Sequence, residues 1–234
     1  MKQIPYFEKL LDTLKPLNPI PMEKYRGKDI SRFRKIETDI LTQEMNCYEA
    51  DKLDKIIMMK ASILGGKLIV WASSIVPADE YDFPVFTSEI VQAVNHVSLR
   101  TDLIPLADCA RDTEYMVKYM EPMQDTWEKY KDIEGMGLER HHWFRVMLSP
   151  FYSYGKFKYD DTIEDKGLEI TAGYLKLFVN NCINAEKKDP KYMELLNSRK
   201  RAMFATLMEK DPGRGPLEKA MGEKDADLIF SLLF

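Results

Sequence analysis

Cysteine and histidine are scarce in this chain of 234 residues, which has three of each. The cysteines, Cys47, Cys109 and Cys182, lie far apart and form no CxxC pair, so the sequence argues against an iron–sulfur cluster, a structural zinc site and a disulfide framework. The histidines form no HExxH motif, and the common nucleotide-binding signatures are missing as well. We therefore expect no metal or nucleotide cofactor held by the protein itself.

A surplus of basic charge and a long apolar run are also missing. The net charge is −4 and the sequence pI is about 5.6, whereas a general nucleic-acid-binding domain is usually basic. No apolar stretch reaches the length of a membrane span, and residues 1–10 lack the apolar centre of a signal peptide. The composition, 45% apolar and 31% charged, predicts one soluble, cytoplasmic domain over residues 1–234.

Methionine and aromatic residues are plentiful, with 14 Met, 12 Tyr, 11 Phe and 3 Trp. Two interpretations stay open for this surplus. It is typical of an adaptable hydrophobic core, because the unbranched Met side chain fills irregular spaces. It is also typical of a pocket for a large flat ligand, on which aromatic rings can stack.

The centre of the chain predicts a meander of strands. Segments 56–64 and 67–76 are rich in apolar and β-branched residues and flank Gly65-Gly66, and segments 85–94 and 96–103 flank Asn95. Strands joined by such short turns form antiparallel hairpins. We expect one or two further strands within residues 143–157.

Helices are predicted on either side of this meander. The first fifty residues have an amphipathic pattern that the prolines after Leu17 interrupt, and residues 112–133 have a stripe of Met and aromatic residues at helical spacing. The pattern Thr162-Ile-Glu-Asp165 resembles a capping box before a stripe that runs from Leu168 to Cys182. Two more helices are predicted over 190–209 and 223–233, so the chain as a whole predicts an α+β domain.

Three segments carry a resemblance to a known family. They are residues 76–91, with the sequence VPADEYDFPVFTSEIV; residues 97–105, with VSLRTDLIP; and residues 209–222, with EKDPGRGPLEKAMG, followed by the terminal LIFSLLF. Together, in this order and spacing, they resemble the ferredoxin-dependent bilin reductases, over roughly residues 55–234.

The resemblance implies a fold and an activity. The fold is a three-layer α/β/α sandwich, in which an open-chain tetrapyrrole sits between a central antiparallel sheet and the C-terminal helices. The activity is the reduction of biliverdin or a dihydrobiliverdin by electrons that arrive one at a time from ferredoxin. It implies a monomer with no metal or flavin of its own, which agrees with the missing signatures.

The resemblance assigns proton donation to two carboxyl groups. Glu89 matches the family's sheet aspartate, and Asp211 matches the aspartate of its D-P-x-R motif. A carboxyl buried against an apolar ligand keeps its proton near neutral pH, as a proton donor must. The residues alone leave other interpretations open, because Glu89 could face solvent from a strand and an aspartate before proline is common in turns.

The chain departs from the family at three positions near these acids. Glu89 stands where most members have aspartate, Thr87 stands where they have glycine, and Ala72 occupies the position of a histidine found in phycocyanobilin:ferredoxin oxidoreductase. The missing histidine puts four-electron phycocyanobilin chemistry in doubt but not reduction in general.

Further residues are expected to hold the tetrapyrrole. Its propionates call for Ser98, Arg140, Arg145, Ser149 and Arg214 near the pocket rim. Trp143, Phe151, Tyr152 and Tyr154 are candidates for stacking on its rings, with core packing as the alternative for each aromatic side chain. A surface or structural task is the alternative for each polar one.

The C-terminal third carries a basic cluster, which we predict as the docking surface for acidic ferredoxin. Its members are Lys187, Lys188, Lys191, Arg199, Lys200, Arg201, Lys210 and Arg214. A solvated helix face is the alternative for such a run. For the whole protein we expect a bilin reductase, with a non-catalytic tetrapyrrole carrier or a plain structural protein as alternatives.

Overall fold

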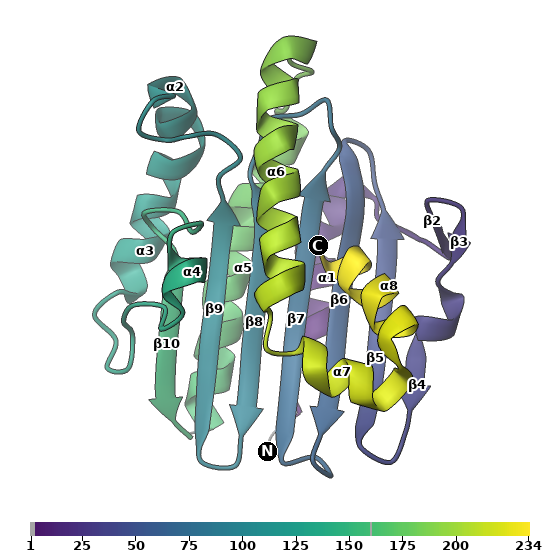
Figure 1. Cartoon of the computed structure of the whole chain (residues 1–234). Helices are drawn as coiled ribbons and strands as arrows, with labels where there is room; N and C mark the ends of the chain where they lie inside the picture. Colours follow the sequence, from purple (N-terminus) through teal and green to yellow (C-terminus); the bar gives the residue numbers. More distant parts are fainter. Residues whose placement is uncertain (1–2, 160) are drawn as a thin grey trace.

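The computed structural model describes residues 3–159 and 161–234 and has three layers, with helices on both faces of a central sheet (Figure 1). One face is covered by α1 (Tyr6–Leu14) and α5 (Asp161–Ile183). The other carries α4 (His142–Arg145), α6 (Pro190–Lys210), α7 (Arg214–Met221) and α8 (Glu223–Leu233). This arrangement confirms the predicted α/β/α sandwich.

The central sheet is antiparallel, and its strands follow one another in the order β5-β6-β7-β8-β9-β10, with β1 and β4 both paired to β5. The four strands predicted from the sequence are β6 to β9, so this part of the meander is confirmed. The strands are β1 (Ile20–Pro21), β4 (Lys35–Glu37), β5 (Leu41–Glu49), β6 (Leu53–Ile63), β7 (Leu68–Pro77), β8 (Val85–Ala93), β9 (His96–Ile104) and β10 (Ser153–Lys158). A separate small hairpin consists of β2 (Lys24–Tyr25) and β3 (Lys28–Asp29).

Two predictions of secondary structure were wrong. Residues 20–49 are mostly strands, because the side chains from Leu41 to Met45 alternate between buried and exposed positions when β5 pairs with β6. Residues 142–145 form the short helix α4 rather than a strand, and only 153–158 of the predicted strand region pairs with β9. Trp143 and its neighbours therefore lie beside the sheet and not within it.

The remaining predicted helices are present. Residues 113–130 form one irregular helical run, made of α2 (Thr113–Tyr115), a π-helical turn over Met116–Met120, a 3-10 turn over Glu121–Met123 and α3 (Gln124–Tyr130). Asp189 caps α6, because its carboxylate accepts the backbone N–H groups of Lys191 and Tyr192. The predicted capping box places the helix start at Thr162, but α5 begins at Asp161, so Thr162 lies within the first turn of the helix. No described helix is long and apolar enough to cross a membrane.

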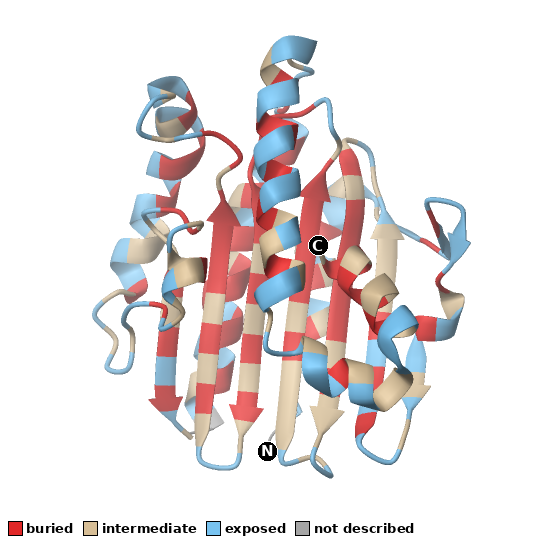
Figure 2. Cartoon of the chain, viewed as in Figure 1, coloured by how far each residue is buried: buried red, intermediate tan, exposed pale blue. Residues whose placement is uncertain are grey.

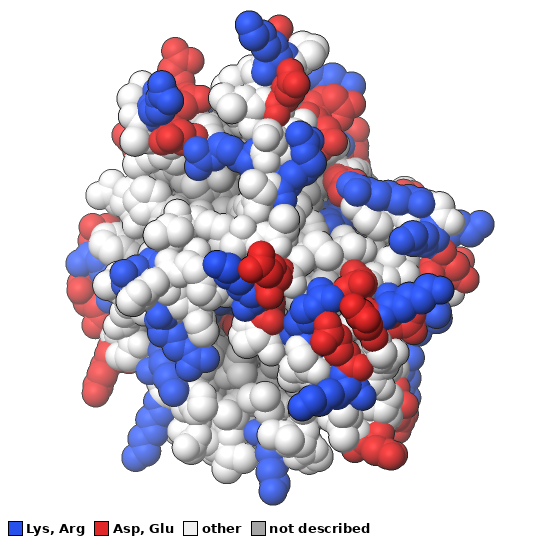
Figure 3. All heavy atoms as spheres, in the orientation of Figure 1, with Lys and Arg blue, Asp and Glu red and all other residues white. Residues whose placement is uncertain are grey.

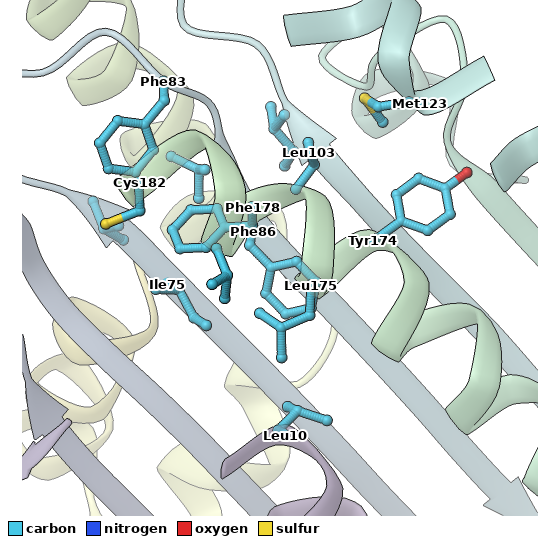
Figure 4. Close-up of a cluster of buried hydrophobic side chains, with 14 of the residues drawn as sticks. Leu10, Ile75, Phe83, Phe86, Leu103, Met123, Tyr174, Leu175, Phe178 and Cys182 are labelled. Carbon is cyan, nitrogen blue, oxygen red and sulfur yellow. The ribbon is translucent and has the colours of Figure 1, made fainter. Parts of the chain in front are cut away.

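The hydrophobic core lies on both sides of the sheet. Figure 4 shows the larger part, in which Leu10 of α1, Phe178 of α5 and Phe86 of β8 belong to one buried cluster. The smaller part packs α8 against β5 and β6 through residues such as Met45, Ile57 and Phe230. The strip of sheet between α8 and α4 is less completely covered, and Figure 2 shows its residues in tan between buried ones in red.

Candidate functional site

The incompletely covered strip, here called the sheet strip, is a row of side chains on the face of the sheet that carries α4 and α6 to α8. Cross-strand pairing places Ala72 of β7 opposite Glu89 of β8, Glu89 opposite Arg100 of β9, and Arg100 opposite Tyr154 of β10. Residues paired in this way point to the same face of an antiparallel sheet. All four are half-buried.

A second row continues the sheet strip and consists of Val70, Val91 and Ser98, which are also half-buried. The alternate residues of the same strands, such as Trp71, Ile90 and Leu99, are buried against the opposite helices. This alternation leaves a surface that combines aliphatic side chains with one acid (Glu89), one guanidinium (Arg100) and the hydroxyls of Ser98 and Tyr154. Such a surface suits a large apolar ligand that carries a few polar groups.

Glu89 forms an ion pair with its neighbour Arg100, with 3.2 Å between Oε1 and Nη2. The same guanidinium lies 3.3 Å, through Nη1, from Oε2 of Glu139. Glu139 is only 1% exposed, and its other oxygen, Oε1, accepts the backbone N–H of His141 at 2.9 Å. Arg100 therefore links the partly exposed carboxylate of the sheet strip to a buried one.

Asp211 follows directly after the last turn of α6 and is half-buried. Its carboxylate accepts the backbone N–H of Gly213 at 2.7 Å, a turn that holds the side chain in place. Burial raises the pKa of Asp211 above its usual value, and the negative charge of Glu89 raises it further, against the lowering effects of Arg100 and His141. The fold thus brings the two predicted acids near each other, although 122 positions separate them in the sequence.

Several predicted ligand-binding residues border the sheet strip. Ser98 lies on it, and Tyr152 accepts the backbone N–H of Glu139 at its hydroxyl. Arg140 is exposed, and its Nε donates to His141. Trp143 and Arg145 belong to α4 and flank Phe144, whose ring lies 4.3 Å from the guanidinium carbon of Arg100. Tyr154 directly faces Arg100 across the strands.

Three other predicted residues make contacts that occupy their polar groups or rings. The Ser149 hydroxyl and backbone N–H both donate to Asp102, at 2.5 and 2.8 Å. Phe151 packs its ring on Trp127 of α3. Arg214 pairs with Glu218 at 2.7 Å and with Asp227. In this structure these contacts fix the segments to which the three residues belong, and the three side chains do not face the sheet strip.

Reasoning from the sequence missed Arg100 and Glu139. Arg100 lies in the quoted segment 97–105, and its pairing with Glu89 follows from a hairpin register centred on Asn95. That signal was available in the predicted hairpin. Glu139 lies in an irregular segment that no pattern placed. Among the described residues, no group of His, Cys, Asp and Glu side chains is arranged to hold a metal ion.

The predicted basic cluster is only partly free in the structure. Lys187 pairs with Glu80, Lys188 with Asp82 and Arg199 with Asp108, at 3.6 to 3.7 Å. Lys200 is buried and pairs with Asp79 at 2.6 Å. The exposed members without an ion pair, within the part of the chain that the structure describes, are Lys191, Arg201 and Lys210.

Known proteins resemble this chain in sequence and in fold. It is 28% identical over 174 residues to phycoerythrobilin:ferredoxin oxidoreductase from Gloeobacter violaceus, which covers 73% of this chain and 69% of that protein. It is 26% identical over 246 residues to the enzyme of the same name from Parasynechococcus marenigrum, and the match covers 98% of this chain and 90% of that protein.

The fold is similar to that of tomato phytochromobilin synthase in its complex with biliverdin. The TM-score is 0.79 at 19% sequence identity, over 95% of this chain and 78% of that chain. The family model of the ferredoxin-dependent bilin reductases matches residues 9–234, which is nearly the whole chain. The chain therefore belongs to the ferredoxin-dependent bilin reductase family, as the three sequence segments predict.

Proposed function

We propose that this protein reduces an open-chain tetrapyrrole, biliverdin IXα or a dihydrobiliverdin, by sequential one-electron transfers from reduced ferredoxin. The observation that carries the proposal is the place of Glu89 on the half-buried sheet strip, together with the electrostatic interaction of its charge with Asp211 at the end of α6. The names of the relatives, phycoerythrobilin:ferredoxin oxidoreductases, support ferredoxin as the electron donor. The protein works as a cytoplasmic monomer without a metal or flavin.

Reduction of one bilin double bond takes two electrons and two protons. Because the electrons arrive from outside, the protein has to orient the bilin and supply protons. Asp211 suits this task because burial favours its protonated form. Glu89 reaches the same surface from the sheet.

The other predicted residues hold the bilin at its edges. Ser98, Arg140 and Arg145 bind the propionates, and Trp143, Tyr152 and Tyr154 stack on the rings or close the rim. Ser149, Phe151 and Arg214 can take part only by giving up the contacts described above.

The function is tested by adding biliverdin IXα under anaerobic conditions, then reduced ferredoxin, and recording the visible spectrum. A reductase first gives the spectrum of bound biliverdin and then new absorbing species as double bonds are lost. Bound biliverdin that stays unchanged would identify a carrier, and no binding spectrum would exclude both functions. Chromatography of the product identifies the reduced bond.

The acids are tested in Glu89→Gln and Asp211→Asn. Both amides keep the size of the side chain but cannot act as the acid, so we expect bilin binding to persist and turnover to fall by about 100-fold or more. Glu194→Gln on the exposed face of α6 is the matched control and should keep full activity. Full activity in both site variants would refute the assignment of proton donors.

A further inference from the structure

Arg100 is the most constrained side chain of the sheet strip. Its two terminal nitrogens contact different carboxylates, Glu89 and Glu139, and its guanidinium lies over the ring of Phe144. Its Nε is buried and has no hydrogen-bond partner among the described residues. The side chain of Glu89 is 31% exposed, whereas that of Arg100 is 18% exposed and that of Glu139 is 1% exposed. A fixed positive charge therefore stands beneath one of the two proposed proton donors.

The two donors consequently differ in their surroundings. Glu89 has a guanidinium at 3.2 Å, and a neighbouring cation favours the ionised form of a carboxyl. Asp211 has no ion-pair partner within the described residues and accepts only the Gly213 N–H. The groups that act electrostatically on Asp211 are Glu89 from β8, Arg100 from β9 and His141 from the segment before α4. Sites that assign different roles to two acids commonly do so through such unequal environments.

We propose that Arg100 is a positioning residue that divides the work of the two acids: it holds Glu89 in an ion pair and leaves Asp211 as the acid that protonates the bilin first. This inference rests on the proposed function. In the first step, ferredoxin is oxidised by one electron and the bilin becomes a radical anion. The O–H bond of Asp211 then breaks while a C–H bond forms on the bilin, which leaves a neutral radical and the Asp211 carboxylate.

The second electron and the second proton complete the reduction of that double bond. Glu89 can supply this proton only after solvent has protonated it and its pair with Arg100 has opened. The Asp211 carboxylate formed in the first step lies in the field of Arg100, which stabilises the new charge. Solvent protonates Asp211 again before the next cycle.

The test follows the bilin radical by stopped-flow absorption and electron paramagnetic resonance after mixing bilin-loaded protein with reduced ferredoxin at a series of pH values. In the wild type, the rate of the first protonation should fall as pH rises through the pKa of Asp211. Asp211→Asn should slow this step by about 100-fold. Glu89→Gln should keep the wild-type rate of the first protonation at pH values below the pKa of Asp211 and should slow the second protonation.

In a plot of the rate of the first protonation against pH, the part where the rate falls at high pH is here called the alkaline limb. This limb should move in opposite directions in two variants. Glu89→Gln removes the negative charge that raises the pKa of Asp211, so the limb moves to lower pH. Arg100→Gln removes the positive charge that lowers it, so the limb moves to higher pH. Arg100→Lys keeps the charge and should restore the wild-type limb. Lys67→Gln, an equal change of charge at the exposed β6–β7 turn, should leave the limb in place.

Arg100→Gln leaves Glu139 buried without its cation, so the double variant Arg100→Gln with Glu139→Gln is measured beside it. The spectrum of bound bilin reports whether each variant is folded. Shifts in the same direction for Glu89→Gln and Arg100→Gln, or loss of the first step in Glu89→Gln with its retention in Asp211→Asn, would overturn the division of roles. A wild type that forms no reduced bilin would instead overturn the proposed function.

Discussion

At the scale of single residues, two of the three positions at which the resemblance implies a departure from the family lie next to each other. Ala72, at the position where a histidine is found in phycocyanobilin:ferredoxin oxidoreductase, pairs directly with Glu89, at the position of the usual aspartate. A small residue beside a longer acid leaves the glutamate free to extend toward Arg100 on the other side. These two departures are therefore cross-strand neighbours on one face of the sheet.

Asp102 is a second buried acid on the same face of the sheet. It is fully buried and accepts both the hydroxyl and the N–H of Ser149, yet burial dominates and raises its pKa to about 7. The folded state therefore holds a proton that the unfolded chain releases above its normal aspartate pKa. This contribution to the free energy of unfolding is complete at low pH and is lost as pH rises toward 7.

We predict that Asp102→Asn removes this dependence on pH. The amide accepts the Ser149 N–H and donates to the Ser149 hydroxyl. The free energy of unfolding of the variant should therefore be close to that of the wild type at about pH 4.5 and should exceed it by roughly a few kcal/mol at about pH 8. Urea denaturation at both pH values measures the difference. Asp132→Asn, which changes an exposed aspartate, is the control. An equal difference at both pH values would contradict the prediction.

The residues of the site were predictable in part. The two acids could be found because each belongs to a sequence segment that resembles the family. Arg100 could have been found from the register of the hairpin that joins β8 and β9. Glu139 could not, because its place beneath Arg100 depends on the path of an irregular segment, and no periodic pattern fixes such a path.

At the scale of elements, one side chain makes polar contacts with groups of all three C-terminal helices. Arg214 pairs with Glu218 of its own helix and with Asp227 of α8, and its Nη1 lies 3.5 Å from the backbone oxygen of Met208 in α6. It therefore connects α6, α7 and α8 beside Asp211. The position of the acid depends on these three helices staying together.

We predict that Arg214→Ala lowers the free energy of unfolding by about 1 kcal/mol, because partly exposed ion pairs contribute little each. Its dissociation constant for biliverdin should change by less than about threefold, because a residue that does not contact the ligand has a small effect on affinity. Thermal denaturation and bilin titration measure the two quantities, with Lys219→Ala, an exposed change in the same helix, as the control. A large loss of affinity at unchanged stability would show that Arg214 binds a propionate.

Most elements with a strong periodic pattern were predicted correctly, although the alternating strand β5 was predicted as helix, and short elements set by tertiary contacts were missed. The hairpins from β6 to β9 have short turns and apolar runs, and α6 and α8 have clear starts. β1 and β4 are two- and three-residue strands that exist only through pairing with β5, and α4 is four residues long. Local sequence carries too little information to specify such short elements.

At the scale of the whole molecule, charges of both signs are mixed over the face that carries α7 and α8 (Figure 3). Many of them pair with each other, as Arg32 does with Asp225 and Arg214 with Asp227. Such pairs offer little net charge to a partner. Of the predicted basic cluster, Lys191, Arg201 and Lys210 are exposed and make no ion pair within the described residues.

We predict that these cations serve ferredoxin docking. The double variant Arg201→Glu with Lys210→Glu should raise the KM for ferredoxin by about tenfold and leave the affinity for biliverdin unchanged, and the wild-type kcat/KM should fall as salt increases. Lys176→Glu on α5, which covers the opposite face of the sheet, is the control. Equal effects of the control and the double variant would place docking elsewhere.

The strand order has a consequence for how the protein is made. From β5 to β9 each strand pairs with the one synthesised just before it, so the sheet can grow hairpin by hairpin as the chain leaves the ribosome. The helices that flank Asp211 and cover the sheet strip emerge after every strand of the sheet. The nascent chain therefore displays an uncovered sheet face until these helices have emerged, and chaperones that bind exposed apolar surface should meet it in that interval.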